Sequence, residues 1–225
     1  MLFGLVQSDL SFEFNIVLLL VFALSLLTGI IPHEVAHGFA ALKQGDPSAK
    51  IAGRLSLNPA KHIDPMGLAA FVFIGIGWAK PVPVNPFNYK NFRRGNFIVS
   101  IAGIITNLVI GFSSSLFLYI VYRFGNVDSL GIFALFYFFF FCTVINISLM
   151  LFNLLPICPL DGYNILVSFT KPTNRYMQFM RQNSHWVLLS VMIFLMLADF
   201  MGYGVIGVVR DGIIDGFLSF WGLMF

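Results

Sequence analysis

Long apolar runs separated by short polar loops dominate the chain and predict helices that cross a membrane. A span takes about 20 helical residues, and Gly45 followed by Pro47 predicts where the first helix ends. We expect four spans and, after the third, a further short helix over residues 160–170. The apolar runs lie at about residues 14–42, 96–122 and 130–155, with a weaker one near 185–209.

The polar segment between the first two spans has the pattern of short strands. Residues 49–59 alternate apolar and polar side chains, which is typical of a strand. Residues 77–86 carry Pro81 and Pro83 at alternate positions, which only an edge strand tolerates. The pattern predicts a small β-hairpin or sheet whose free edge adds an extended substrate segment. A structured loop without substrate contact is the alternative.

The predicted fold class is an all-α polytopic membrane protein with about four to six transmembrane or re-entrant helices and this small hairpin. No internal repeat, low-complexity tract or inserted soluble domain interrupts the sequence. We expect a single membrane-embedded domain over residues 1–225, with its core at 14–170 and C-terminal helices at 184–225. The last of these, from Asp211 onward, is expected to be a short amphipathic or re-entrant piece.

Composition and charge agree with a membrane location. Hydrophobic residues make up 58% of the chain and charged residues 10%, which excludes an ordinary soluble domain. The net charge of +3 is too small and too scattered for a nucleic-acid surface. Short cytoplasmic loops collect lysine and arginine, so we expect the N-terminus outside and the basic loops inside. Those loops carry Lys43, Lys50, Arg54, Lys61, Lys80, Lys90, Arg93 and Arg94, then Lys171, Arg175 and Arg181.

The first apolar run contains three ionisable residues, His33, Glu34 and His37. Residues four apart share a face of a helix, so both imidazoles can point at one ion. In this HExxH pattern two histidines hold zinc and the glutamate acts as general base on a water molecule that zinc activates. Isolated polar residues near a water interface are the alternative. Ionisable groups at membrane depth are costly enough to favour a functional site.

A catalytic zinc takes three protein ligands, so a third ligand is needed elsewhere in the chain. Asp161 stands out, because the sequence "PLDG" places an acid just after the third span. A cap on the following helix is the alternative role for Asp161. The other candidates fit a turn, an interfacial anchor and two packing positions in apolar sequence; they are His62, His185, Cys142 and Cys158.

Four motifs follow one another over about residues 14–170, namely "HEVAHGFAA", "GRLSLNPAKHIDPMG", "KPVPVNP" and "NLLPICPLDG". Together they resemble the site-2 protease family of intramembrane zinc metalloproteases, peptidase family M50. The resemblance is to the compact bacterial form without PDZ or CBS domains. It implies one zinc ion held by His33, His37 and Asp161, with Glu34 as the catalytic base.

The second span departs from the family pattern at one point. Many relatives carry a glycine-proline pair before an asparagine, where this chain has Gly103 and Ile104 before Asn107. The resemblance implies that Asn107 and Asn153 lie at the active site, where either would orient the substrate or support an oxyanion. Hydrogen bonds between spans are the alternative role for both asparagines.

These observations predict an intramembrane zinc metalloendopeptidase that cleaves transmembrane segments of other proteins in the plasma membrane of a bacterium. Its partners would be the lipid bilayer and a transmembrane protein substrate, and not a nucleic acid. A membrane metal-ion transporter and a catalytically silent pseudoprotease that binds membrane helices are the alternatives. The chain has only 4 histidines, too few for the histidine boxes of a membrane desaturase. No oligomeric state is predicted.

Overall fold

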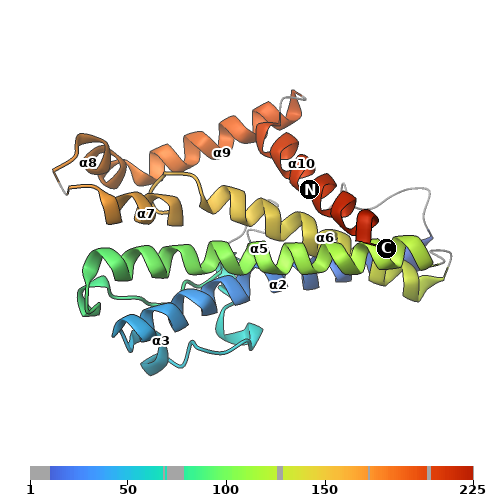
Figure 1. Ribbon diagram of the computed structural model, residues 1–225, viewed down its shortest axis with the longest axis horizontal. Coiled ribbons are helices and arrows are strands. Elements are labelled where there is room, and N and C mark those ends of the chain that lie inside the picture. Colours follow the sequence, from blue (N-terminus) through green and yellow to red (C-terminus); the bar gives the residue numbers. More distant parts are fainter. Residues whose placement is uncertain are drawn as a thin grey trace.

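Three long apolar helices form the body of the molecule (Figure 1). The computed structural model describes residues 11–67, 69, 79–125, 129–171, 173–201 and 204–224. Within this part of the chain, 3 helices are long and apolar enough to cross a membrane. They are α2 (Phe12–Gln44), α5 (Phe92–Phe124) and α6 (Leu130–Asn153), and they confirm the first three predicted spans.

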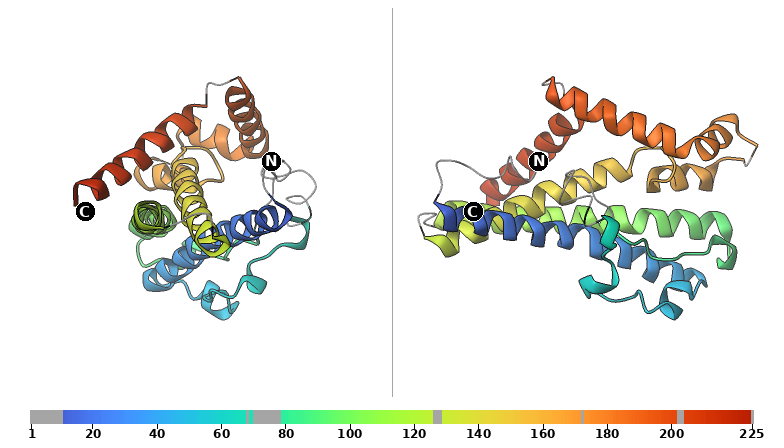
Figure 2. Two further views of the ribbon diagram at one scale, coloured as in Figure 1. Left: turned by 90° about the vertical axis from the view of Figure 1, so that its right-hand side faces the viewer. Right: turned by 180° about the vertical axis from the view of Figure 1, so that it is seen from behind.

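The three helices lie side by side along most of their length (Figure 1 and Figure 2). Near the start of α2, aromatic rings fill the space between α2 and α6; those of Phe22 and Phe141 meet edge to face with centroids 5.1 Å apart. Near the end of α2, small residues replace them, and Ala40 and Ala41 pack against Val99 of α5. Small side chains let two helix backbones approach closely, so α2 and α5 come closest in the half of the bundle that carries the histidines.

A short helix, α7 (Asp161–Phe169), follows α6 and confirms the helix predicted over residues 160–170. It packs against α5, where the buried amide of Asn96 donates a hydrogen bond to the Asn164 carbonyl. Gly162 lies so close to the preceding turn that an added Cβ would be 2.3 Å from a backbone carbonyl oxygen. These contacts fix the start of α7 relative to the two long helices around it.

The predicted fourth span is divided into two helices. In place of one helix over residues 185–209, the chain forms α9 (Ser184–Phe200) and α10 (Val205–Met224). The sequence "MGYG" at 201–204 contains two glycines, and glycine disfavours a helix interior. The described residues therefore hold three helices long and apolar enough to span, and not four.

The two C-terminal helices differ in how they meet the bundle. On α10, the buried indole of Trp221 donates from Nε1 to Ser115 Oγ of α5 at 2.9 Å, and Ile214 joins a cluster with Ile104 and Ile147. On α9, every described side chain is at least partly exposed. Figure 2 shows α9 standing away from the long helices, whereas α10 returns to them.

The predicted hairpin between α2 and α5 is wrong for the described residues, which form no strand there. The segment predicted as the first strand begins within a helical turn, α3 (Ser48–Ile51). In the second segment, Pro81 and Pro83 have no N–H to donate to a strand ladder. Among the described residues of this segment, one isolated antiparallel bridge joins Ile63 and Ala79. Residues 77–78 of the predicted strand lie outside the described residues.

Short 3-10 turns complete this loop, and both are capped by asparagine side chains. In η1 (Pro59–Lys61) the side chain of Asn58 accepts a hydrogen bond from a backbone N–H, and in η2 (Pro86–Asn88) Asn85 does the same. Proline fixes the backbone angle that begins each turn. The described part of the loop is therefore ordered mainly by caps and turns.

The carboxylate of Asp46, just past the end of α2, holds the loop together. It is fully buried and accepts hydrogen bonds from Ser48 N at 3.1 Å, Ser48 Oγ at 2.5 Å, Asn85 N at 2.6 Å and Asn88 Nδ2 at 2.8 Å. Burial alone would raise the pKa of Asp46, but these hydrogen bonds outweigh burial and hold the pKa below its usual value. Burial, with the nearby Asp46 charge, raises the pKa of Tyr89 to about 12.

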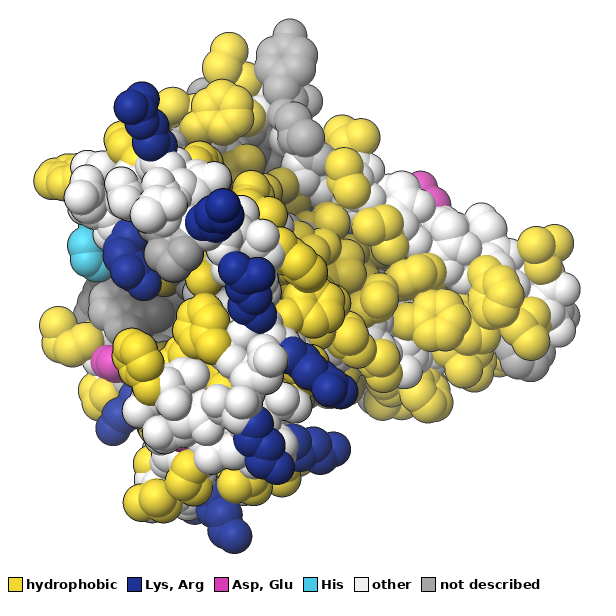
Figure 3. Space-filling model, turned by 60° about the vertical axis from the view of Figure 1, so that its left-hand side comes forward, with side chains coloured by type: hydrophobic (Ala, Val, Ile, Leu, Met, Phe, Trp, Pro, Cys, Tyr) yellow, Lys and Arg dark blue, Asp and Glu magenta, His cyan; other side chains and the backbone are white. Residues whose placement is uncertain are grey.

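Lysine and arginine side chains gather at the end of the molecule where α2 finishes and α5 begins (Figure 3). The same end carries α3, α7 and a further short helix, α8 (Arg175–Gln182) (Figure 1). The basic loops of the sequence, which are separated along the chain, thus share one end of the bundle.

Candidate metal centre

Two histidines of α2 meet in the interior of the bundle. The side chains of His33 and His37 are buried, with 7% and 9% of their surface exposed. Their Nε2 atoms lie 3.0 Å apart. Because α2 is helical through both positions, the four-residue spacing places both imidazoles on one face of the helix.

The start of α7 brings a carboxylate to the same point. Oδ2 of Asp161 lies 3.3 Å from Nε2 of His33 and 3.3 Å from Nε2 of His37. Among the described residues these three side chains form a cluster able to hold a metal ion. Asp161 does not cap its helix, because Leu160 occupies the N-cap position and no side chain makes a capping hydrogen bond there.

The spacing of the three ligand atoms fits a zinc ion. Bonds of about 2.0–2.2 Å from tetrahedral zinc to nitrogen and oxygen separate the ligand atoms by roughly 3.3–3.6 Å, close to the 3.0–3.3 Å found here. Oδ2 of Asp161 is buried and has no hydrogen-bond partner among the described residues. An unsatisfied buried carboxylate oxygen is costly, and a cation held by all three atoms would remove that cost.

The surrounding backbone orients the second histidine. Nδ1 of His37 lies 2.7 Å from the carbonyl oxygen of Val99 on α5. A carbonyl oxygen only accepts hydrogen bonds, so Nδ1 carries the proton and Nε2 presents its lone pair to the cluster. This contact fixes both the tautomer and the ring orientation that metal binding needs.

Gly103 of α5 closes one side of the cluster. A Cβ added at Gly103 would lie 2.5 Å from Cε1 of His33 and 2.6 Å from Nε2 of His37. No side chain larger than hydrogen fits between the α5 backbone and the two rings without a shift. The sequence draws attention to the missing proline at Ile104, whereas the direct packing role belongs to Gly103, the glycine before it.

The carboxylate of Glu34 is held by the loop before α5. Its Oε2 accepts a hydrogen bond from the backbone N–H of Val82 at 2.9 Å. Val82 is buried and belongs to the "KPVPVNP" motif. The described residues place no hydrogen bond on Oε1 of Glu34, so this oxygen is available to another group.

Asn107 lies one helical turn beyond Gly103 on α5 and is fully buried. Neither its Oδ1 nor its Nδ2 has a hydrogen-bond partner among the described residues. Asn153, at the end of α6, donates from Nδ2 to the Leu149 carbonyl of its own helix at 3.0 Å. The two asparagines therefore differ, because both amide atoms of Asn107 lack a partner among the described residues, whereas one N–H of Asn153 is already used.

The remaining ligand candidates do not join the cluster. His62 is buried in the loop, where Nε2 donates to the Ser56 carbonyl oxygen at 2.7 Å. The hydroxyl of Thr28 lies 3.3 Å from Sγ of Cys142. Cys158 is half-buried, and His185 is exposed near the start of α9.

Sequence reasoning missed two buried polar residues outside this cluster. The predicted helix ending at Gly45 and Pro47 assigns no role to Asp46, although an aspartate two residues before Ser48 is a signal for a side-chain turn. Asn146 of α6 is fully buried, and its Oδ1 has no hydrogen-bond partner among the described residues. An asparagine within an apolar span is the signal that would have drawn attention to Asn146.

Comparison with known proteins adds an independent observation. The family model described as Peptidase family M50 matches residues 119–198. That match includes Asp161 and leaves out the two histidines. No solved structure matches the chain.

Two curated bacterial proteins match most of the chain. "Putative zinc metalloprotease YwhC" of Bacillus subtilis (strain 168) is 35% identical over 196 residues, which cover 86% of this chain and 89% of that protein. "Putative zinc metalloprotease Rip2" of Mycolicibacterium smegmatis (strain ATCC 700084 / mc(2)155) is 30% identical over 175 residues, covering 75% of this chain and 64% of that protein. The first match extends over nearly the whole of both proteins.

Proposed function

The chain belongs to peptidase family M50, the site-2 protease family, and from that premise we propose that it is an intramembrane endopeptidase that cleaves transmembrane segments of other proteins. It is a zinc metalloprotease with several apolar helices. The proposal adds the residues that do the chemistry, the class of substrate and the orientation in the membrane.

One observation carries the proposal, which is the convergence of three ligand atoms from two distant segments. Nε2 of His33, Nε2 of His37 and Oδ2 of Asp161 all lie within 3.3 Å of one another. The ligands come from apolar helices, and a buried ionisable cluster at such a depth favours a functional site. These three residues would hold the zinc ion.

Catalysis would divide between the ion and Glu34. Zinc, when bound, supplies Lewis-acid chemistry, which lowers the pKa of water and polarises a peptide carbonyl. Glu34 would accept the proton from the attacking water on Oε1, since Oε2 already accepts the Val82 N–H. The same carboxyl group would then donate the proton to the leaving amine. The Val82 contact keeps the carboxylate from rotating away from this role.

The asparagines would act on the substrate. Asn107 is fully buried with an unused amide N–H and carbonyl, which suits it to hold an extended peptide or to donate to a developing oxyanion. Asn153 would contribute less, because its N–H already donates to its own helix. Neither role requires a β-strand in the loop before α5.

The proposed orientation follows from the basic end of the bundle. Lysine and arginine collect in cytoplasmic loops, and here they gather where α2 ends and α5 begins (Figure 3). The N-terminus would then lie outside, and the metal centre would lie toward the cytoplasmic end of α2. A bacterial plasma membrane is the expected location.

The test uses purified full-length protein, added zinc and a model transmembrane substrate. Glu34→Gln should abolish cleavage and keep zinc bound, because Glu34 is not among the clustered ligands. The matched control is Glu13→Gln, the same change at an exposed position in the first turn of α2, which should leave both cleavage and zinc unchanged. Undiminished cleavage by Glu34→Gln would exclude Glu34 as the base.

A further inference from the structure

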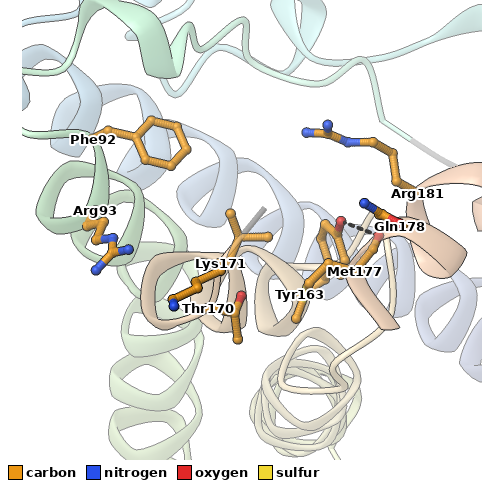
Figure 4. A pocket seen from close by; sticks show the side chains of 9 residues that line it. Phe92, Arg93, Tyr163, Thr170, Lys171, Met177, Gln178 and Arg181 are labelled. Atoms are coloured by element: carbon orange, nitrogen blue, oxygen red, sulfur yellow. Dashed lines mark hydrogen bonds between the residues drawn. The ribbon is translucent and has the colours of Figure 1, made fainter. Parts of the chain in front are cut away.

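A second concave region lies beside α7, apart from the metal ligands. It is a cavity of about 200 Å³ between the start of α5, α7 and α8 (Figure 4), here named the α7–α8 pocket. Its wall includes Tyr163 and Val167 of α7 and Thr170 just after it; Tyr163 and Val167 are four residues apart and share one face of the helix. Asp161 precedes Tyr163 by two residues, about 200° around a helix. The pocket and the metal centre therefore use opposite faces of α7.

Three cations line the α7–α8 pocket, and no acid does. Arg93 comes from α5, Lys171 follows α7, and Arg181 belongs to α8. Figure 4 shows Arg93 and Lys171 on one side and Arg181 on the other. Among the described residues, none of the three makes an ion pair with a carboxylate. Three unpaired positive charges around one cavity favour an anion as its occupant.

The donors suit a phosphate group. Two arginines offer planar forks of N–H donors and the lysine offers a third charged donor, a combination that matches several phosphate oxygens. The Tyr163 hydroxyl is already used, because it donates to the Met177 carbonyl at 3.1 Å. Tyr163, Val167 and Met177 therefore supply mainly apolar surface below the charged rim.

The surroundings suit a lipid more than a soluble anion. The pocket lies where the α5 span begins, at the basic end of the bundle (Figure 3). Phe169 and Phe179, which adjoin lining residues in the sequence, expose 68% and 53% of their surface. Helix α8 has arginines and glutamines interleaved with aromatic residues and methionines, as in helices that lie in a membrane interface. A charged headgroup bound in this pocket would therefore lie beside the apolar acyl chains of the bilayer.

We propose that the α7–α8 pocket binds the phosphate headgroup of an anionic phospholipid. The headgroup would contact Arg93, Lys171 and Arg181 together, and its acyl chains would run along the exposed phenylalanines. This inference goes beyond proteolysis, since occupancy requires neither zinc nor Glu34. The bound lipid would brace α7 from the side opposite Asp161.

Full-length protein in nanodiscs of phosphatidylcholine with added phosphatidylglycerol tests the proposal. The measurement is the number of phosphatidylglycerol molecules that stay bound after gentle removal of the bulk lipid, counted by native mass spectrometry. Removing one cation should weaken retention about fivefold. The triple variant Arg93→Gln, Lys171→Gln, Arg181→Gln should lose it altogether.

The matched control is the double variant Arg94→Gln, Arg175→Gln, whose exposed arginines lie in α5 and α8 within two residues of the pocket lining but are not part of it. It should retain the lipid as the wild type does. Equal loss in this control would overturn the proposal in favour of general surface charge. Zinc content and helical circular dichroism establish that each variant is folded, and they do not depend on the lipid result.

A second measurement separates the possible sources of phosphate. Inorganic phosphate and an acidic peptide are titrated against protein that holds phosphatidylglycerol. If the lipid stays bound at millimolar phosphate, the proposal stands. Displacement by inorganic phosphate would assign the pocket to a soluble anion, and displacement by the acidic peptide would assign it to a protein segment. Either displacement overturns the lipid assignment.

Discussion

Two aspartates at the ends of helices show how differently this chain uses a carboxylate. Asp46 accepts four hydrogen bonds and is fully enclosed by its own loop. Asp161 faces two histidines, and its Oδ2 has no hydrogen-bond partner among the described residues. The folded chain supplies hydrogen bonds to Asp46, whereas Asp161 lies with His33 and His37 in a cluster able to hold a metal ion. One carboxylate organises the loop, and the other belongs to the candidate metal site.

The difference separates stability from metal binding. Hydrogen bonds to a charged group each stabilise a fold by about 1.5–3 kcal/mol, so the loop at Asp46 should depend strongly on that carboxylate. A carboxylate that lacks such bonds contributes little to the fold without its ion. A change at Asp46 should therefore lower the free energy of unfolding and leave zinc binding intact, whereas a change at Asp161 should weaken zinc binding without destabilising the fold.

The largest expected effect is the loss of zinc in Asp161→Asn. Removing a direct ligand should weaken zinc binding by more than about 100-fold, the upper end for residues that merely support ligands. Peptidase activity should vanish with the metal. Zinc per chain after dialysis, measured by mass spectrometry, checks this.

In the presence of a chelator, Asp161→Asn should be at least as stable as the wild type, because the change removes the cost of an unsatisfied buried carboxylate oxygen. Full zinc occupancy in the variant would contradict the assigned ligand set. The search for a third ligand would then return to Cys158 and His62.

The next largest effect is the loss of stability in Asp46→Asn. Asn85 N and Asn88 Nδ2 donate to different oxygens of Asp46, and an asparagine amide has only one acceptor oxygen. One of these hydrogen bonds is lost, so the free energy of unfolding should fall by about 1.5–3 kcal/mol. Zinc content should stay at the wild-type level. Equilibrium unfolding in detergent, with zinc analysis of the same sample, measures both quantities.

The matched control for Asp46→Asn is Asp64→Asn. Asp64 accepts two backbone N–H groups in the same loop, in a role that asparagine fills equally well. Its variant should be nearly as stable as the wild type. Comparable destabilisation by both variants would mean that loop aspartates in general, and not Asp46 in particular, set the stability.

The third effect concerns the helix that backs the metal centre. In Gly103→Ala the new methyl group would meet His33 and His37 at about 2.5 Å, so the rings must move and zinc affinity should fall about 10- to 100-fold. Gly131→Ala is the control, because an added Cβ there meets nothing within 4 Å. Competition with a zinc chelator measures both affinities. Equal affinities would show that α5 yields without disturbing the ligands.

Much of the fold could be predicted because it depends on local pattern. Three spans follow from the length of apolar runs, and the shared face of His33 and His37 follows from a spacing of four. The hairpin was wrong because alternation over residues 49–59 only resembled a strand, while a helical turn and prolines left few N–H groups to pair. The role of Asp46 could not be predicted, since Asn85 and Asn88 lie 39 and 42 residues away and only the folded loop brings them together.

The metal centre lies between these two cases. Spacing alone supports the histidine pair, but nothing local requires Asp161 to reach it. The meeting depends on Asn96 and Gly162, which fix α7 against α5 and the preceding turn. The role of Gly103 could not be predicted from local sequence either, because the requirement for a residue without a Cβ arises only where α5 packs against the histidines of α2.

The smallest expected effect is the pH dependence of the stability that Asp46 provides. Because the folded-state pKa of Asp46 is lowered, the unfolded chain, with an aspartate pKa of about 3.9, binds more protons as the pH falls through that value. Stability from Asp46 is therefore fully present above about pH 5 and is lost progressively below pH 4. Unfolding in a chelator should show wild type and Asp46→Asn converging in acid. If the difference in free energy of unfolding between wild type and Asp46→Asn stayed constant with pH, the destabilisation would come from the altered shape of the side chain and not from its charge.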